Sequence, residues 1–123
     1  MANILIIDDE DAIRGMVRIL LERRGHAILE AADGELGIAA FRANSIDLVI
    51  TDAIMPNKDG LETIAEIRKE DPEVKIIIIS GGGHRLAVDI LAQAKELGAD
   101  MAVKKPFSPG ELTETVESLL KTA

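Results

Sequence analysis

Five short aliphatic runs, each followed by a segment with helical periodicity, constrain the fold of this 123-residue chain more than any other feature. The expected strands are residues 3–7, 27–31, 48–52, 74–79 and 100–104. Strict alternation of strands and helices with short connections is typical of a parallel sheet that carries helices on both faces. The alternation therefore predicts an α/β protein with a doubly wound, five-stranded parallel sheet.

The helical segments have recognisable starts and stops. The first has the i, i+3, i+4, i+7, i+8 apolar spacing of an amphipathic helix. Its buried face is expected to consist of Ile13, Met16, Val17, Leu20 and Leu21. Arg23 and Arg24 are expected in its last turn, with Gly25 ending it. The second helix is expected to open at Asp33-Gly34, and the third to span residues 58–69. The fourth helix is expected to end at Gly98, and the fifth to begin after a cap at Ser108.

Composition excludes several classes of protein. The formal net charge of −8 and a pI near 4.7 repel phosphate backbones, so direct binding of nucleic acid is not expected. The absence of cysteine excludes disulfides and thiolate metal sites. No apolar run approaches the roughly 20 residues of a membrane span, and no signal peptide opens the chain. We expect a cytoplasmic protein in which residues 1–123 form one domain, with no room for an output domain.

Polar residues follow four of the expected strands. The run Leu48–Asp52 ends abruptly in a carboxylate and is followed by a proline and an Asp-Gly pair, which indicates a buried strand and then a loop. In open α/β sheets, ligands bind outside the carboxyl ends of the strands. The residues expected at that edge are Asp8, Asp9, Asp52, Ser80 and Lys105.

Three carboxylates, a hydroxyl and an ammonium group form a coherent site for phosphoryl transfer. Clustered carboxylates need a cation nearby, and hard oxygen ligands without His or Cys suit Mg²⁺. Asp52 can act as a nucleophile toward phosphorus, giving an aspartyl phosphate. Lys105 can pair with a phosphoryl oxygen, and the Ser80 hydroxyl can donate to another.

The chain resembles the receiver domains of two-component response regulators, in particular the stand-alone chemotaxis-type regulators. The resemblance covers essentially the whole chain, and five features in the right order carry it. These are Asp8-Asp9 after an apolar strand, the Ala32-Asp33-Gly34-x-x-Gly37 junction, Asp52 followed by Met55-Pro56 and Asp59-Gly60, Ser80 after an aliphatic strand, and Lys105-Pro106-Phe107.

The resemblance implies a flavodoxin-like (βα)5 fold with sheet order 2-1-3-4-5, and a role for each site residue. Asp52 would accept a phosphoryl group from a sensor histidine kinase or a histidine phosphotransfer protein. Asp9 and Asp52 would bind Mg²⁺ directly, Asp8 through water, and Ile54 through its backbone carbonyl. Lys105, joined to Pro106 by a cis peptide bond, would contact the phosphoryl group, and Ser80 would move toward it.

The same resemblance implies a switch rather than a conventional enzyme. The chain would catalyse only its own phosphorylation and dephosphorylation, and the modification would change its binding to a downstream protein target. Such a regulator would be a monomer or a phosphorylation-dependent dimer.

Two positions depart from the family pattern. Ala102 occupies the strand position, three residues before the lysine, where the family usually carries Tyr or Phe, so aromatic rotation cannot report the switch there. Residues 81–83 are all glycine, which widens the accessible backbone conformations of the loop after Ser80. We hypothesise that signalling orders this loop and repositions the following helix.

Two other readings of the site remain open at this point. In a haloacid-dehalogenase-like phosphatase the nucleophile would be Asp9, in the arrangement Asp9-Glu10-Asp11. A pseudo-receiver would keep the fold as a binding module that never accepts phosphate. The aspartate that becomes phosphorylated distinguishes the three readings.

Overall fold

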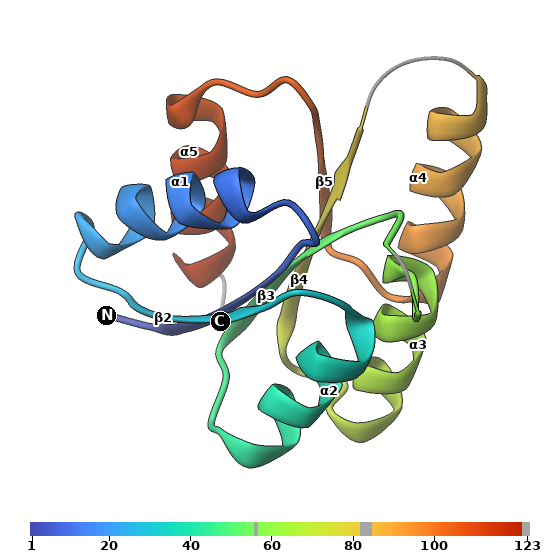
Figure 1. The fold of residues 1–123 in the computed structure, drawn as a ribbon, viewed down its shortest axis with the longest axis horizontal. Helices are drawn as coiled ribbons and strands as arrows, with labels where there is room; N and C mark the ends of the chain where they lie inside the picture. The colour runs from blue at the N-terminus through green and yellow to red at the C-terminus, as the bar shows by residue number, and fades with distance from the viewer. Residues whose placement is uncertain (56, 82–84, 122–123) are drawn as a thin grey trace.

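The computed structural model describes residues 1–55, 57–81 and 85–121, with the backbone alone for residues 85–89. Its elements in chain order are β1 (Asn3–Ile7), α1 (Asp11–Glu22), β2 (Ala27–Ala31), α2 (Gly34–Ala43), β3 (Leu48–Asp52), α3 (Gly60–Glu70), β4 (Lys75–Ser80), α4 (Arg85–Leu97), β5 (Met101–Lys104) and α5 (Pro109–Lys121). The strands form one parallel sheet in the order β2-β1-β3-β4-β5 (Figure 1). The predicted flavodoxin-like (βα)5 fold is confirmed.

The sheet separates two apolar cores, because successive strand residues point to opposite faces. Helices α1 and α5 cover one face, and α2, α3 and α4 cover the other (Figure 1). On the α1/α5 side the core includes Ile4, Ile6, Val17, Leu21, Ile50, Ile77, Ile79, Leu112 and Val116. On the other side it includes Leu5, Ile7, Val49, Ile64, Ile67, Ile76, Ile78 and Ala94. Strands buried on both faces are almost continuously apolar, which explains the aliphatic runs in the sequence.

Helix α3 begins two residues later than predicted. Asp59 has an extended backbone (φ −76°, ψ 174°), and its carboxylate accepts a hydrogen bond from the Glu62 N–H at 2.9 Å. Asp59 is therefore the N-cap, and the predicted start at Lys58 was wrong because the capping residue lies outside the helix. The helix also extends one residue beyond the predicted end, to Glu70.

Other boundaries differ by one or two residues. Helix α1 ends at Glu22, so Arg23 and Arg24 lie in the following turn rather than in the last helical turn. Strand β4 runs one residue further than predicted, to Ser80, and β5 begins at Met101. Asp100 lies outside β5, and its carboxylate accepts a hydrogen bond from the Ile76 N–H at 2.8 Å.

The predicted caps of α2 and α5 are confirmed. Asp33 accepts a hydrogen bond from the Leu36 N–H, and Ser108 Oγ accepts one from the Glu111 N–H at 3.1 Å. The Glu111 carboxylate in turn accepts from the Ser108 N–H, which completes a capping box. Gly98, which follows α4, has a φ of +121°, a conformation that glycine adopts at little cost.

The loop expected to act as a switch falls largely outside the described residues, since residues 82–84 are not among them. The hypothesis about ordering of this loop stays a prediction. Within the described ranges, no helix combines the length and the apolar character needed to cross a bilayer.

Candidate functional site

The carboxyl ends of four strands bring the predicted site residues to one edge of the sheet. Ile7 of β1 pairs with Thr51 of β3, so Asp8 and Asp52 follow in register on adjacent strands. Ser80 pairs with Lys104, which places Lys105 immediately beyond the end of β5. The Lys105 N–H donates to the Ser80 carbonyl at 2.8 Å and fixes this junction.

Lys105 lies at the centre of an acidic group. Its Nζ is 3.3 Å from Glu10 Oε1, 3.4 Å from Asp8 Oδ2 and 3.5 Å from Asp52 Oδ2. The lysine side chain is only 15% exposed, so the interactions take place in a partly desolvated setting. One ammonium group therefore faces three carboxylates.

The Asp52 carboxylate is held in a fixed orientation. Asp52 is 7% exposed, and its Oδ1 accepts a hydrogen bond from the Ala53 N–H at 2.8 Å. Its Oδ2 faces Lys105. One oxygen is thus tied to the backbone, while the other points into the charged group.

Excess negative charge and burial shift the pKa values of these groups. Burial, followed by the neighbouring Asp8 charge, raises the pKa of Asp52 to about 6, although Lys105 and the Ala53 N–H act in the opposite direction. Burial also raises the pKa of Asp8, which is 1% exposed. Burial disfavours the charged form of Lys105, but the charges of Asp52 and Asp8 outweigh it and raise the lysine pKa. A second cation at the site would relieve this imbalance.

Asp8, Glu10 and Asp52 fit a divalent cation. Each offers a carboxylate oxygen, and these oxygens lie within 4.8 Å of one another. Two of the three residues are buried, and oxygen-only ligands are the preference of Mg²⁺. Two of these carboxylates, Asp8 and Asp52, are among the expected magnesium ligands, and Glu10 is an additional one.

The structure places the other expected ligands differently. Asp9 is exposed and lies outside this group of three. Ile54 follows Asp52 by two residues and is 64% exposed. Its side chain has no ligand atom, so only its backbone carbonyl is able to bind a metal. Direct binding by Asp9 and Ile54 stays a prediction.

Sequence reasoning missed Glu10. Its backbone N–H donates to Asp8 Oδ1 at 2.9 Å, a tight turn that directs the Glu10 side chain toward Lys105. The sequence offered a signal, because Glu10 directly follows the two aspartates.

Ser80, Pro106 and Ala102 agree with the expected layout. Ser80 is buried, with its hydroxyl donating to the Gly81 carbonyl at 3.4 Å. The Lys105–Pro106 peptide bond is cis, as predicted. Ala102 is half-buried on β5 and packs against the core on the α2–α4 side.

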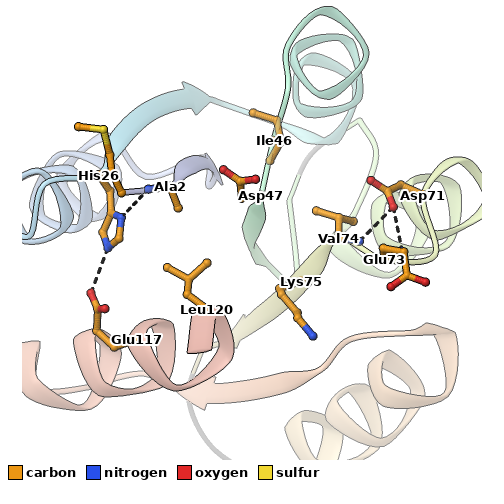
Figure 2. Close-up of a pocket in the computed structure, with 11 residues that line it drawn as sticks. Ala2, His26, Ile46, Asp47, Asp71, Glu73, Val74, Lys75, Glu117 and Leu120 are labelled. Atoms are coloured by element: carbon orange, nitrogen blue, oxygen red, sulfur yellow. Dashed lines mark hydrogen bonds and ion pairs between the residues drawn. The ribbon is translucent and has the colours of Figure 1, made fainter. Parts of the chain in front are cut away.

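A cavity of about 480 Å³ lies at the opposite edge of the sheet, between the amino ends of the strands (Figure 2). His26 Nδ1 accepts from the Ala2 N–H at 3.1 Å, and Nε2 lies 3.0 Å from Glu117 Oε1. Asp71 accepts from the N–H groups of Glu73 and Val74. These groups already have protein partners and lie on the far edge from Asp52, so this cavity is not the candidate site.

Comparison with known proteins identifies the family. The model of the response regulator receiver domain matches residues 4–117. The chain belongs to this family. The receiver domain is 38% identical to the transcriptional regulatory protein ResD of Bacillus subtilis over 121 residues, and 39% identical to the probable transcriptional regulator ycf27 of Cyanidium caldarium. These matches cover 98% and 97% of the chain but 49% and 46% of the relatives, so the chain spans about half the length of the curated relatives it matches.

Solved receiver domains have the same fold. A response regulator receiver domain protein from Clostridium thermocellum superposes with a TM-score of 0.90 at 34% identity, covering 99% of this chain and 96% of that one. The receiver domain of NtrX from Brucella abortus gives 0.90 at 33% identity, with 98% and 99% covered. Chemotaxis protein CheY4 of Vibrio cholerae gives 0.87 at 28% identity, with 96% and 98% covered. This chain is therefore a receiver domain of two-component signalling, a class of regulators rather than of conventional enzymes.

Proposed function

We propose that this receiver domain accepts a phosphoryl group on Asp52 in a reaction that depends on Mg²⁺, and that the modification changes its binding to a protein target. The donor would be a sensor histidine kinase or a histidine phosphotransfer protein. Residues 1–123 would act as one receiver unit in this exchange. The observation that carries the proposal is the buried Asp52 carboxylate facing Lys105 within the acidic group.

The proposed step needs few groups. An oxygen of Asp52 forms a bond to phosphorus while the P–N bond of phosphohistidine breaks, and the histidine nitrogen leaves with the electron pair. The hydrogen bond from Ala53 orients the carboxylate for this attack. Lys105 is within reach of the phosphoryl oxygens and would stabilise their charge, and Ser80 would donate to another oxygen.

The acidic group would hold the metal. Asp52 and Asp9 are the expected direct ligands, with Asp8 through water and the Ile54 carbonyl, and Glu10 is a further carboxylate within reach. Mg²⁺ bound there supplies positive charge that offsets both the carboxylates and the incoming phosphoryl group.

Acetyl phosphate labelling tests the proposal. The protein is incubated with acetyl phosphate in Mg²⁺ or in EDTA, and intact mass and peptide mapping locate the label. We expect one phosphoryl group on Asp52, in Mg²⁺ only, and none on Asp52→Asn. The matched variant Asp9→Asn separates metal binding from acceptance of the phosphoryl group. It should slow the labelling reaction, but the label should still be found on Asp52.

Other outcomes would favour the alternative readings. A label on Asp9 would identify the phosphatase-like chemistry. No label under any condition would indicate a pseudo-receiver and overturn the proposal. The ResD and ycf27 relatives are named transcriptional regulators, a description of proteins about twice as long. For the residues present here, the net charge of −8 still favours a protein partner over DNA.

A further inference from the structure

Asp33 joins two loops that flank the acidic site. Its Oδ1 accepts the Leu36 N–H at 2.8 Å and caps α2, while its Oδ2 accepts a hydrogen bond from Asn57 Nδ2 at 2.9 Å. Because a carboxylate can only accept, the Asn57 amide nitrogen is the group that faces it. One side chain thus links the β2–α2 junction to the loop between β3 and α3.

Asn57 lies in the loop that carries the phospho-acceptor end of β3. It follows Asp52 by five residues and Ile54 by three, and its φ of +68° is in the left-handed region. The Gly60 N–H donates to the Ala53 carbonyl at 2.8 Å and closes the loop at its base. The Asp33–Asn57 bridge restrains the same loop nearer its tip.

A second contact joins the two junctions independently. A Cβ on Gly34 would overlap the Lys58 carbonyl and Oγ1 of Thr63, so the β2–α2 junction packs directly on the loop and on α3. Gly34 and Asp33 are neighbours within the Ala32-Asp33-Gly34-x-x-Gly37 segment. This packing fixes the distance that the hydrogen bond spans.

We propose that Asp33 and Asn57 are positioning residues for the phosphoryl-transfer site, and that their bridge holds the β3–α3 loop in the conformation that binds the divalent cation. The inference rests on the proposed function above. The bridge touches neither the metal nor the phosphoryl group. It acts by restraining the loop that carries the Ile54 carbonyl.

Two substitutions separate positioning from helix capping. Asp33→Ser keeps an oxygen that caps α2, but its shorter side chain cannot also reach Asn57. Asn57→Gly tolerates the left-handed backbone but removes the whole side chain and adds backbone freedom, so Asp33→Ser, which leaves the loop sequence unchanged, is the stricter of the two tests. Asn44→Ala is the matched control, because it removes an exposed Asn amide hydrogen bond, to the Ala40 carbonyl at 2.9 Å, at the other end of α2.

Titration with Mg²⁺ alone, followed by backbone amide NMR, provides the test. We expect Asn57→Gly and Asp33→Ser each to weaken Mg²⁺ binding about 2- to 10-fold, the range for losing one hydrogen bond. The double variant should bind no more weakly than either single variant, because both remove the same bridge. Amides of residues 53–55 and 57–59 should exchange faster in metal-free buffer in both variants. Asn44→Ala should change neither quantity.

Each contrary result has a definite meaning. Unchanged Mg²⁺ affinity or unchanged loop exchange in Asn57→Gly and Asp33→Ser would overturn the inference, as would effects that simply add in the double variant. Mg²⁺ binding by the unmodified protein without labelling of Asp52 would overturn the proposed function and leave the positioning role intact. Absence of Mg²⁺ binding by the unmodified protein would overturn both.

Discussion

At the scale of single residues, the balance of charge around Lys105 determines the behaviour of the site. Asp8, Glu10 and Asp52 surround one ammonium group at 3.3 to 3.5 Å. Burial raises the pKa values of both buried aspartates, the Asp8 charge adds to the rise at Asp52, and the lysine offsets only part of these shifts. Holding these buried carboxylates close together costs stability in the metal-free protein.

Replacing Asp52 by Asn should therefore leave the metal-free protein equally or more stable. The amide removes a buried charge but can still accept the Ala53 hydrogen bond, and Lys105 keeps its other partners. In EDTA at pH 7, we expect the free energy of unfolding to rise by between about 0 and 2 kcal/mol. Urea denaturation measures it. The exposed Asp9→Asn variant is the control and should change stability by less than about 0.5 kcal/mol, as surface changes usually do. A loss above about 1 kcal/mol in Asp52→Asn would contradict the charge-imbalance account.

The same pKa shift predicts a pH dependence. The folded-state pKa of Asp52, about 6, lies above its ordinary value of 3.8, so the folded state binds more protons than the unfolded state between these values. The contribution of Asp52 to stability therefore falls as pH rises from about 4 to about 6, in the metal-free protein. Asp8 contributes with the same sign.

Urea unfolding in EDTA at pH 5 and pH 7 isolates this effect when the unmodified protein is compared with Asp52→Asn. Other titrating groups are common to both proteins and cancel in the difference. We expect the variant to gain relative stability on going from pH 5 to pH 7. A difference that is independent of pH would show that Asp52 titrates at its ordinary value.

At the scale of elements, the connection from β3 to α3 has little freedom to change where it ends, at Gly60. A Cβ on Gly60 would overlap the backbone oxygen of Asp52 and crowd Ala53 Cα, so glycine is required for close packing rather than for an unusual φ. We expect Gly60→Ala to cost more than about 2 kcal/mol of unfolding free energy, because the backbone itself must move.

Gly15 provides the matched control for that prediction. It lies within α1, and a Cβ there would meet nothing within 4 Å. Gly15→Ala should stabilise the protein by about 0.5 to 1 kcal/mol through helix propensity. Urea unfolding of both variants tests the pair. Equal effects of the two substitutions would rule out the close approach at Gly60.

The elements themselves were predictable because their signals are local. Aliphatic runs and apolar spacing located every strand, and those helix ends that were predicted, to within about two residues, and Asp33 and Ser108 identified two helix starts. The two-residue error at the start of α3 arose where Asp59 has both a turn signal and a capping role. Asp52 and Ser80 were predictable because each is the polar residue that ends an aliphatic strand, and Lys105 because it directly follows β5.

The rest of the site depends on contacts between loops that local patterns do not encode. Glu10 reaches Lys105 only because Asp8 binds the Glu10 N–H and turns the chain. The bridge between Asp33 and Asn57 joins residues 24 apart in sequence. Neither pairing follows from periodicity or spacing, so the sequence predicted the composition of the site better than its internal connections.

At the scale of the whole molecule, the candidate site and the apolar cores lie in different regions of the sheet. The acidic group lies at the carboxyl ends of the strands, and the apolar residues lie on the two faces. Among the residues that the structure describes, the two cores share no buried residue. Ile64 of α3 and Val116 of α5 are both fully buried, on opposite sides of the sheet (Figure 1).

This partition has a thermodynamic consequence: the two faces should behave as independent sources of folding free energy. Ile64→Val and Val116→Ala remove methyl groups from different cores, and substitutions without shared partners add to within about 0.5 kcal/mol. Urea unfolding of the two single variants and the double variant measures this, and the free energy lost in the double variant should equal the sum of the two single losses to within about 0.5 kcal/mol. A larger discrepancy would mean that the strands transmit packing strain from one face to the other. Additivity would mean that helices on one face can be redesigned for a new partner without retuning the other.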